Sequence, residues 1–302
     1  MRIRNILAVG GGVMGSQPGF YYAMNGYDVV QYDISREALA ACREYHQVYV
    51  EPFRATFPAV TDEQIEAGLA RIRYSSDLAE AARDADLVTE SVPEVLEVKR
   101  QVWADLHRHC PAHTIFTTNT STLLPSAIAD ATGRPGQFLA LHYCIGMWDG
   151  PIGEVMKHPG TEDSVFQQVV EFVESANLIP IKLEKEQPGY VINSILLPWL
   201  QGALDLVVNG ICSYQDVDRT WMLCSRGMPL GPIAILDLVG FEVYRNVQIA
   251  KAVAEPGNAQ YQKNIDYLEE NFISHGYKGA MSGQGFYSYP EPEYTQPNFL
   301  KN

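Results

Sequence analysis

The chain has 302 residues, which is the length of one large domain or two smaller ones. Its composition, 46% hydrophobic and 19% charged with 24 glycines, is typical of a globular protein and excludes a disordered or collagen-like chain. The net charge of −14, from 36 acidic and 22 basic side chains, repels phosphate backbones and anionic membrane surfaces. We therefore expect neither nucleic acid nor a membrane as a partner.

Cysteine usage indicates a reducing compartment. The five cysteines are odd in number and form no Cys-x-x-Cys pair, which argues against a disulfide framework and against a zinc ribbon. The apolar run near the N-terminus is too short for a signal peptide, and no segment approaches the length of a transmembrane span. We expect a cytoplasmic protein.

Up to about residue 183, short β-branched or aliphatic runs alternate with longer segments of helical period. The predicted strands are residues 6–9, 29–32, 72–74, 87–89, 115–118, 138–141 and 179–183. Helix signals lie between them, including a capping-box spacing at Thr61 and Gln64. This alternation predicts an α/β domain with a doubly wound, mostly parallel sheet that has helices on both faces.

The second part of the chain is predicted to be all-helical. After Gln187-Pro-Gly189 the strand signals cease, and helices are expected at residues 191–208, 214–223, 233–253 and 259–272. We place the domain boundary after residue 186, which gives domains 1–186 and 187–302. The last dozen residues, rich in Pro, Tyr and Glu, are expected to form an extended tail.

The strongest local motif is a G-x-G-x-x-G that follows the first predicted strand and opens a helix. It consists of Gly10, Gly11, Gly12, Val13, Met14 and Gly15. Glycines in this pattern allow a tight turn and close approach of a pyrophosphate, which the backbone N–H groups and the helix dipole bind. We expect a dinucleotide at this loop.

Asp33 ends the second predicted strand, where a carboxylate accepts hydrogen bonds from an adenosine ribose and repels a 2′-phosphate. This favours NAD over NADP. The alternative is that Asp33 is a solvated turn acid or the cap of the helix that starts near Arg36. Pro18, in the second turn of the preceding helix, removes a hydrogen bond there, which costs about 3 kcal/mol or kinks the helix.

A second group of polar residues follows two strand ends, where doubly wound sheets bind ligands. Asn119 and Ser121 come after residues 115–118, His142 closes the next strand, and Glu154 follows twelve residues later. A histidine with a carboxylate partner transfers protons near neutral pH. The alternatives are a structural histidine, or a hydrolase with Ser121 as nucleophile, although no G-x-S-x-G elbow is present.

No metal is expected. His107, His109 and His113 flank Cys110, but their spacing matches no metal site that geometry justifies. The run from Gly283 to Tyr287 is predicted to be a structural turn with packed aromatic side chains.

Taken in order, these motifs resemble the L-3-hydroxyacyl-CoA dehydrogenase family over almost the whole chain. They are the glycine loop, Asp33, Glu90-Ser-Val-Pro-Glu94, Asn119-Thr-Ser121, His142 with Glu154, Gly189-Tyr-Val-Ile-Asn193 and Gly283-Gln-Gly-Phe-Tyr287. Within that family, residues 119–125, 139–142 and 152–156 are similar to the branch of bacterial diketoreductase and L-gulonate 3-dehydrogenase (lambda-crystallin).

The resemblance implies a Rossmann-like domain, a helical domain that forms a homodimer, and an NAD-dependent enzyme that interconverts a 3-oxo and an (S)-3-hydroxy group. It implies that His142 is the general acid/base, oriented by Glu154, and that Ser121 and Asn193 hydrogen-bond the substrate. It also implies cofactor contacts for Glu94, Lys99 and Asn119.

The sequence departs from the family pattern in two places. Ile145 stands where the family has Asn, and residues 146–151 replace its Asn-Pro-Pro-type run. Pro18 and Gly19 replace a small apolar pair. These departures keep open an alternative, an NAD(H)-binding structural or regulatory protein with weak turnover.

The acyl carrier stays open between a CoA thioester, a free acid and an ester. Between residues 44 and 73, near where family members contact the CoA nucleotide, the chain offers Arg54, Arg71 and Arg73 against five acidic side chains. This excess of negative charge favours a smaller 3-oxo substrate. Backbone amides and helix N-termini still leave a CoA thioester open.

Overall fold

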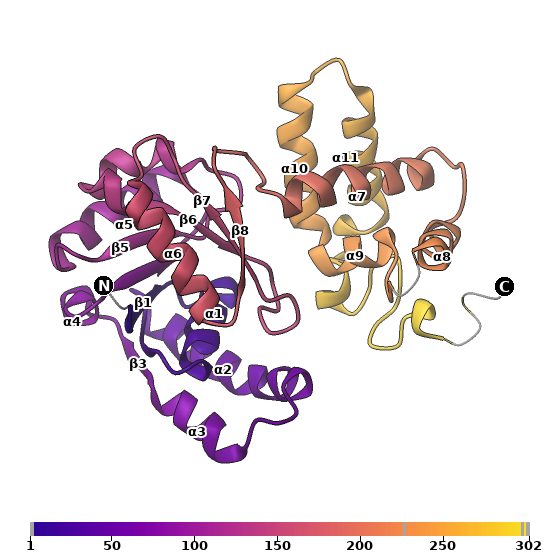
Figure 1. Ribbon diagram of the computed structural model, residues 1–302. Coiled ribbons are helices and arrows are strands. Elements are labelled where there is room, and N and C mark those ends of the chain that lie inside the picture. The colour runs from indigo at the N-terminus through magenta and orange to yellow at the C-terminus, as the bar shows by residue number, and fades with distance from the viewer. Residues whose placement is uncertain (1–2, 226–227, 297–298, 300–302) are drawn as a thin grey trace. The chain divides into compact units, whose positions relative to one another are not determined.

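The computed structural model describes residues 3–225, 228–296 and 299. The chain forms two compact units, Met1–Ile192 and Asn193–Asn302, the first α/β and the second helical (Figure 1). The predicted fold class is confirmed. The contacts divide the chain after Ile192, whereas the sequence places the domain boundary after residue 186.

The first unit is built on one sheet of eight strands in the order β3-β2-β1-β4-β5-β6-β7-β8. All neighbouring pairs are parallel except β6 with β7. The strands are β1 (Asn5–Val9), β2 (Asp28–Tyr32), β3 (Ile72–Ser75), β4 (Leu87–Glu90), β5 (Ile115–Thr118), β6 (Phe138–Tyr143), β7 (Ile152–Met156) and β8 (Ile179–Leu183). The strand list from sequence was incomplete, because β7 was not among the predicted strands.

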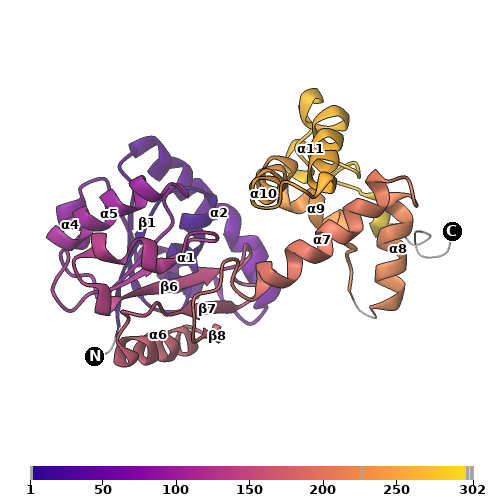
Figure 2. The same ribbon diagram turned by 90° about the horizontal axis from the view of Figure 1, so that it is seen from above.

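Helices cover both faces of this sheet. Successive strand residues point to opposite faces, so alternate residues of one strand pack against different helices. Ile6 and Ala8 of β1 pack in the core with α1, α2 and α6, while Leu7 and Val9 pack with α4 and α5. Figure 2 shows α5 and α6 on opposite sides of the strands. The helices are α1 (Val13–Met24), α2 (Arg36–Thr56), α3 (Asp62–Ala70), α4 (Leu78–Ala82), α5 (Leu96–His109) and α6 (Asp163–Ser175), with 3₁₀ turns η1 (Pro125–Ala127), η2 (Ala129–Thr132) and η3 (Pro135–Gln137).

Two local predictions in the first unit can be compared directly. The capping box at the start of α3 is confirmed, since the Gln64 N–H donates to Thr61 Oγ1 and the Thr61 N–H donates to Gln64 Oε1. Pro18 lies inside α1, which is continuous from Val13 to Met24, so the proline does not end the helix.

The helical unit packs its helices around an apolar core. They are α7 (Ile192–Val208), α8 (Tyr214–Cys224), α9 (Pro232–Val239), α10 (Phe241–Ala254) and α11 (Ala259–Asn271), followed by 3₁₀ turns η4 (Ile273–His275), η5 (Ala280–Ser282) and η6 (Glu293–Thr295). The single helix predicted over residues 233–253 was wrong: Gly240, with φ of +87°, separates α9 from α10.

The extended tail predicted at the C-terminus is interrupted by η6, and residues 297–298 and 300–302 of it lie outside the described residues. Among the helices of residues 3–225, 228–296 and 299, none is both long and apolar enough to cross a membrane.

The run from Gly283 to Tyr287 is a structural turn, as predicted. The buried Asp237 carboxylate accepts the N–H groups of Phe286 (2.9 Å) and Tyr287 (3.0 Å). A side chain at Gly285 would overlap that carboxylate, so only glycine allows this approach. The Tyr287 hydroxyl donates to Asp218 (2.8 Å), which in turn accepts two N–H groups at the start of α9.

Candidate active site

The glycine loop joins β1 to α1 at the switch point of the sheet, between β1 and β4. Gly10 has φ of +109°, and a Cβ there would lie 2.7 Å from the Ser91 carbonyl oxygen. A Cβ at Gly12 would meet nothing within 4 Å, so this residue borders open space. Gly12 precedes α1 without a capping side chain, which leaves the first N–H groups of Val13, Met14 and Gly15 directed at that space. These features fit a bound pyrophosphate.

Asp33 ties this loop to the end of β2. Its Oδ2 accepts the Gly11 N–H (2.7 Å) and its Oδ1 accepts the Ser35 N–H (2.8 Å). Each carboxylate oxygen has a second lone pair, which remains available to a ribose hydroxyl. The alternative role of Asp33 as helix cap was wrong, because Ser35 is the N-cap of α2 and accepts the Ala38 N–H.

Side chains near Pro18 and on neighbouring elements form hydrogen bonds with backbone carbonyls of the glycine loop and the start of α1. The Gln17 amide and the Tyr49 hydroxyl both donate to the Val13 carbonyl (3.3 Å each). A Cβ at Gly19 would overlap the buried Gln31 side chain, whose Nε2 donates to the Gly10 carbonyl (2.6 Å). Gly19 therefore allows a close contact between α1 and β2, which periodicity alone did not predict.

Lys99 forms an ionic cluster with Glu90, at the end of β4, and Glu94, in which Lys99 and Glu90 are buried. Lys99 is 1% exposed, and its ammonium lies 2.6 Å from Glu90 and 3.3 Å from Glu94. Glu90 also accepts the Thr118 hydroxyl (2.7 Å), which joins β4 to β5.

Glu94 organises the loop that carries Ser121. Its carboxylate accepts the N–H groups of Ser121 (3.0 Å) and Thr122 (2.9 Å) and the Thr120 hydroxyl. Burial raises the pKa of Glu94, but the Thr120 hydrogen bond and the Lys99 charge outweigh it and lower that pKa to about 2. Glu94 is therefore an anion that fixes the backbone on which Ser121 stands. The cofactor contacts expected for Glu94 and Lys99 stay predictions.

His142 and Glu154 face each other across the antiparallel pair β6 and β7. His142 Nδ1 lies 2.8 Å from Glu154 Oε2, and both side chains are buried. A carboxylate only accepts hydrogen bonds, so Nδ1 carries the hydrogen. His142 Nε2 lies 3.3 Å from the Oγ of the half-buried Ser121. The structure thus brings together three of the predicted catalytic residues, and β7, which the sequence did not reveal, is the element that does so.

Asn119 links three strand ends behind this pair. Its Oδ1 accepts the Tyr143 N–H (3.0 Å) and its Nδ2 donates to Ser91 (3.1 Å). Asn193 lies in the first turn of α7 and begins the second unit. The roles assigned to both by resemblance stay predictions.

Tyr190, which belongs to the motif of residues 189–193, contacts His142 directly. Its ring stacks on the His142 ring with 4.5 Å between centroids and 16° between planes. Sequence reasoning missed this contact, because no local pattern relates residues 142 and 190.

Residues 146–150, which depart from the family pattern, form a loop anchored on α1 and α2. The Gly146 N–H donates to Gln17 Oε1 (2.8 Å), and the Thr56 hydroxyl donates to Asp149 (2.7 Å). Trp148 is buried against Tyr49, with 5.1 Å between ring centroids. Ile145, just before the loop, is 71% exposed.

The histidines near Cys110 take part in other contacts. His107 accepts a hydrogen bond from Arg134, and His113 pairs with Asp86. In the described part of the chain, no three His, Cys, Asp or Glu side chains converge as metal ligands would.

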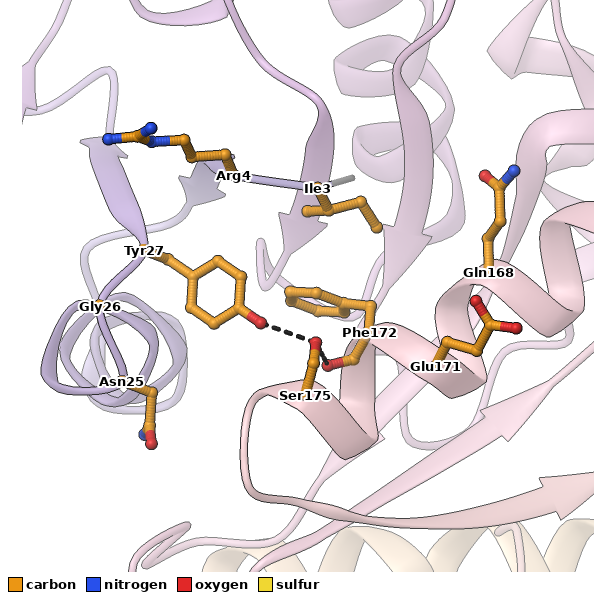
Figure 3. Close-up of a pocket in the computed structure, with 9 residues that line it drawn as sticks. All are labelled: Ile3, Arg4, Asn25, Gly26, Tyr27, Gln168, Glu171, Phe172 and Ser175. Atoms are coloured by element: carbon orange, nitrogen blue, oxygen red, sulfur yellow. Dashed lines mark hydrogen bonds between the residues drawn. The ribbon is translucent and has the colours of Figure 1, made fainter. Parts of the chain in front are cut away.

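A cavity of about 620 Å³ opens near the amino ends of β1 and β2 (Figure 3). Arg4 and Tyr27, which line it, precede the first residues of β1 and β2, and the Tyr27 hydroxyl lies 2.8 Å from Ser175 Oγ. The glycine loop and His142 lie at the carboxyl ends of the strands, so this cavity is separate from the candidate active site.

Comparisons with known proteins identify the family of this chain. The NAD-binding domain of 3-hydroxyacyl-CoA dehydrogenase matches residues 5–187, and the C-terminal domain of that family matches residues 189–289. The mitochondrial hydroxyacyl-coenzyme A dehydrogenase of Rattus norvegicus is 30% identical, covering 95% of this chain and 91% of the relative. A probable 3-hydroxybutyryl-CoA dehydrogenase of Bacillus subtilis is 28% identical, covering 96% of this chain and 99% of the relative.

A solved structure of a diketoreductase, described as acting on dicarbonyl compounds, is 40% identical with a TM-score of 0.87. The match covers 96% of this chain and 100% of the diketoreductase chain. With both family models matched, the chain belongs to the 3-hydroxyacyl-CoA dehydrogenase family and is an NAD-dependent oxidoreductase.

Proposed function

We propose that the protein interconverts a 3-oxo group and an (S)-3-hydroxy group, with His142 as general acid/base and Glu154 as its orienting partner. The observation that carries the proposal is the buried pair, in which His142 Nδ1 lies 2.8 Å from Glu154 and Nε2 faces Ser121. An imidazole held in this way exchanges protons through Nε2 near neutral pH.

The cofactor, when bound, would supply the hydride chemistry at C3: NADH donates the hydride in reduction, and NAD⁺ accepts it in oxidation. In the reducing direction, the His142 imidazolium donates the proton on Nε2 to the 3-oxo oxygen. In the oxidising direction, neutral Nε2 takes the proton of the 3-hydroxyl. Glu154 keeps the hydrogen on Nδ1 and stabilises the imidazolium, while we assign Ser121 Oγ to a hydrogen bond with the same substrate oxygen.

Replacing His142 with Ala tests this assignment. General acid/base catalysis contributes ~10²–10⁴-fold, so His142→Ala lowers kcat by that factor. The Kd for NADH stays near the wild-type value, because the glycine loop is untouched. His109→Ala, at an exposed position at the end of α5, is the matched control and keeps wild-type turnover. Wild-type turnover in His142→Ala contradicts the assignment.

We propose a substrate smaller than a CoA thioester. The basic side chains of residues 44–73 are engaged by carboxylates: Arg54 with Asp62 (2.6 Å), Arg71 with Asp28 (3.0 Å) and Arg73 with Glu80 (3.9 Å). The 40% identity to a diketoreductase supports the same choice. The family relatives that act on CoA thioesters support the alternative.

The substrate is tested by NADH oxidation with acetoacetyl-CoA, a free 3-oxo acid and a 3,5-dioxo ester in parallel. We expect a higher kcat/KM for a substrate without CoA. A preference for acetoacetyl-CoA contradicts the proposed substrate but not the acid/base role of His142. NADH binding without turnover of any of the three favours the alternative of a binding protein.

A hydrolase is not favoured, although Ser121, His142 and Glu154 lie in contact. An acyl-transfer site needs free N–H groups to bind an oxyanion. Here the N–H groups of Ser121 and Thr122 donate to the Glu94 carboxylate, which is anionic and would repel one.

We also propose a cytoplasmic homodimer. All five cysteines are free, which suits a reducing compartment, and α10 exposes Val243, Ile249 and Val253 as apolar surface for a second copy. Light scattering is expected to give twice the mass of the chain.

A further inference from the structure

The segment between β8 and α7 has an unusual backbone. Gly189 has φ of +80° and Tyr190 has φ of +53°, so both lie in the left-handed region. This region is uncommon for a bulky residue without special support. The Tyr190 side chain is 1% exposed and packs with Ala140, Met156 and Leu183, so burial of the ring holds the backbone in this conformation.

The Tyr190 ring restrains the plane of the His142 imidazole. The hydrogen bond from Nδ1 to Glu154 restrains the rotation of the imidazole about its Cβ–Cγ bond but does not fix it fully. The stacked ring, 4.5 Å away and only 16° from parallel, blocks that rotation. With both contacts, Nε2 has one orientation, toward Ser121.

The Tyr190 backbone restrains Glu154. Directly after the left-handed residues, the N–H groups of Val191 and Ile192 donate to Glu154 Oε1 at 2.8 and 3.0 Å. The other oxygen, Oε2, binds His142 Nδ1. The turn at Tyr190 is what directs these two N–H groups to the carboxylate, so Glu154 is held on one side by the backbone and on the other by His142.

We propose that Tyr190 is a positioning residue for proton transfer, which orients His142 by ring stacking and Glu154 through the N–H groups that follow it. This proposal rests on the acid/base role of His142. It assigns the effect to the ring and the backbone turn, not to the phenol hydroxyl. Burial raises the pKa of Tyr190 well above its usual range, so the side chain is a neutral phenol.

Three variants separate these contributions in one assay of NADH oxidation with the best 3-oxo substrate. Tyr190→Phe keeps the ring and is expected to retain the wild-type kcat. Tyr190→Asn removes the ring while Asn tolerates the left-handed backbone, so it isolates the loss of stacking. His142→Gln removes the acid/base itself and reports on the proposed function.

Misorientation of a catalytic group costs up to about 100-fold in rate, so we expect Tyr190→Asn to lower kcat by about 10- to 100-fold. The KM for the substrate and the Kd for NADH stay near wild type, and retained NADH binding shows that the variant is folded. Tyr190→Phe, which keeps the ring, retains the wild-type kcat. If the hydroxyl were responsible for the effect, Tyr190→Phe would lose activity as Tyr190→Asn does.

Two outcomes overturn the inference: wild-type kcat in Tyr190→Asn, or an equal loss of kcat in Tyr190→Phe, which assigns the effect to the hydroxyl. If His142→Gln keeps its activity, the proposed function fails instead. If His142→Gln is inactive while Tyr190→Asn is unaffected, only the role of Tyr190 fails.

Discussion

Two carboxylates in the first unit, Glu154 and Glu94, each accept backbone N–H groups at the candidate site. Glu154 binds His142 with one oxygen and two N–H groups with the other. Glu94 binds the N–H groups beneath Ser121. Residue types alone indicated the first partnership, because His with Glu is a common acid/base pair. They did not indicate the second, since the hydrogen bonds of Glu94 depend on the path of a loop.

At the same scale, Glu94→Gln is predicted to destabilise the first unit. The lowered pKa of Glu94, about 2, means that its anion stabilises the fold at pH above about 4.5, and that this contribution is lost as the pH falls toward 2. With the carboxylate about one-third exposed, we expect a loss of about 1–2 kcal/mol in the free energy of unfolding at pH 7.

Chemical denaturation of wild type and Glu94→Gln at pH 7 and pH 3 measures this difference. The gap between the two proteins narrows at pH 3, because the wild-type side chain begins to lose its advantage. An equal gap at both pH values contradicts the role of the charge. Glu97→Gln, at an exposed acidic residue in the first turn of α5, serves as the control.

At the scale of elements, the departures from the family pattern lie on two segments that contact each other, α1 and the loop after β6. The loop at residues 146–150 is hydrogen-bonded to Gln17 and packed on Tyr49 through Trp148, next to the helix that contains Pro18. Trp148 also packs on Phe20, so the loop after β6 and the helix that contains Pro18 share one part of the core.

Trp148→Ala tests this anchor. Removing a buried Trp side chain costs about 3–5 kcal/mol, so we expect a loss of that size in the free energy of unfolding. Trp148→Phe keeps an aromatic ring against Tyr49 and is expected to lose clearly less. If the Ala variant loses under about 1 kcal/mol, the loop is not anchored by this side chain.

The sequence did not predict β7 or the break between α9 and α10, because both depend on information that local sequence patterns do not contain. β7 contains Gly153 and Glu154, which break the apolar alternation. A Cβ at Gly153 would lie 3.0 Å from Val173, so a larger residue there would push that side chain aside. β7 is a strand because β6 and β8 pair with it. Likewise, the apolar period continues across Gly240, where only the backbone shows the break between α9 and α10.

At the scale of the molecule, the alternation of strand and helix signals predicted an α/β unit followed by a helical one, and the structure confirms it. The glycine loop and Asp33 were likewise recognisable, because their chemistry depends on neighbours close in sequence. The stacking of Tyr190 and the anchoring by Gln17 depend on contacts between distant segments, so no local pattern contains them. The chain has more acidic than basic side chains, which gives its net charge of −14. In line with this excess, acidic partners engage the three arginines between residues 44 and 73.

The most direct measurement is a single-turnover stopped-flow experiment with NADH bound to excess enzyme and a 3-oxo substrate added. It follows the chemical step alone, free of product release. We predict that His142→Ala slows NADH oxidation ~10²–10⁴-fold while binding NADH as wild type does. An unchanged single-turnover rate constant in His142→Ala would contradict the proposed acid/base role of the pair formed by His142 and Glu154.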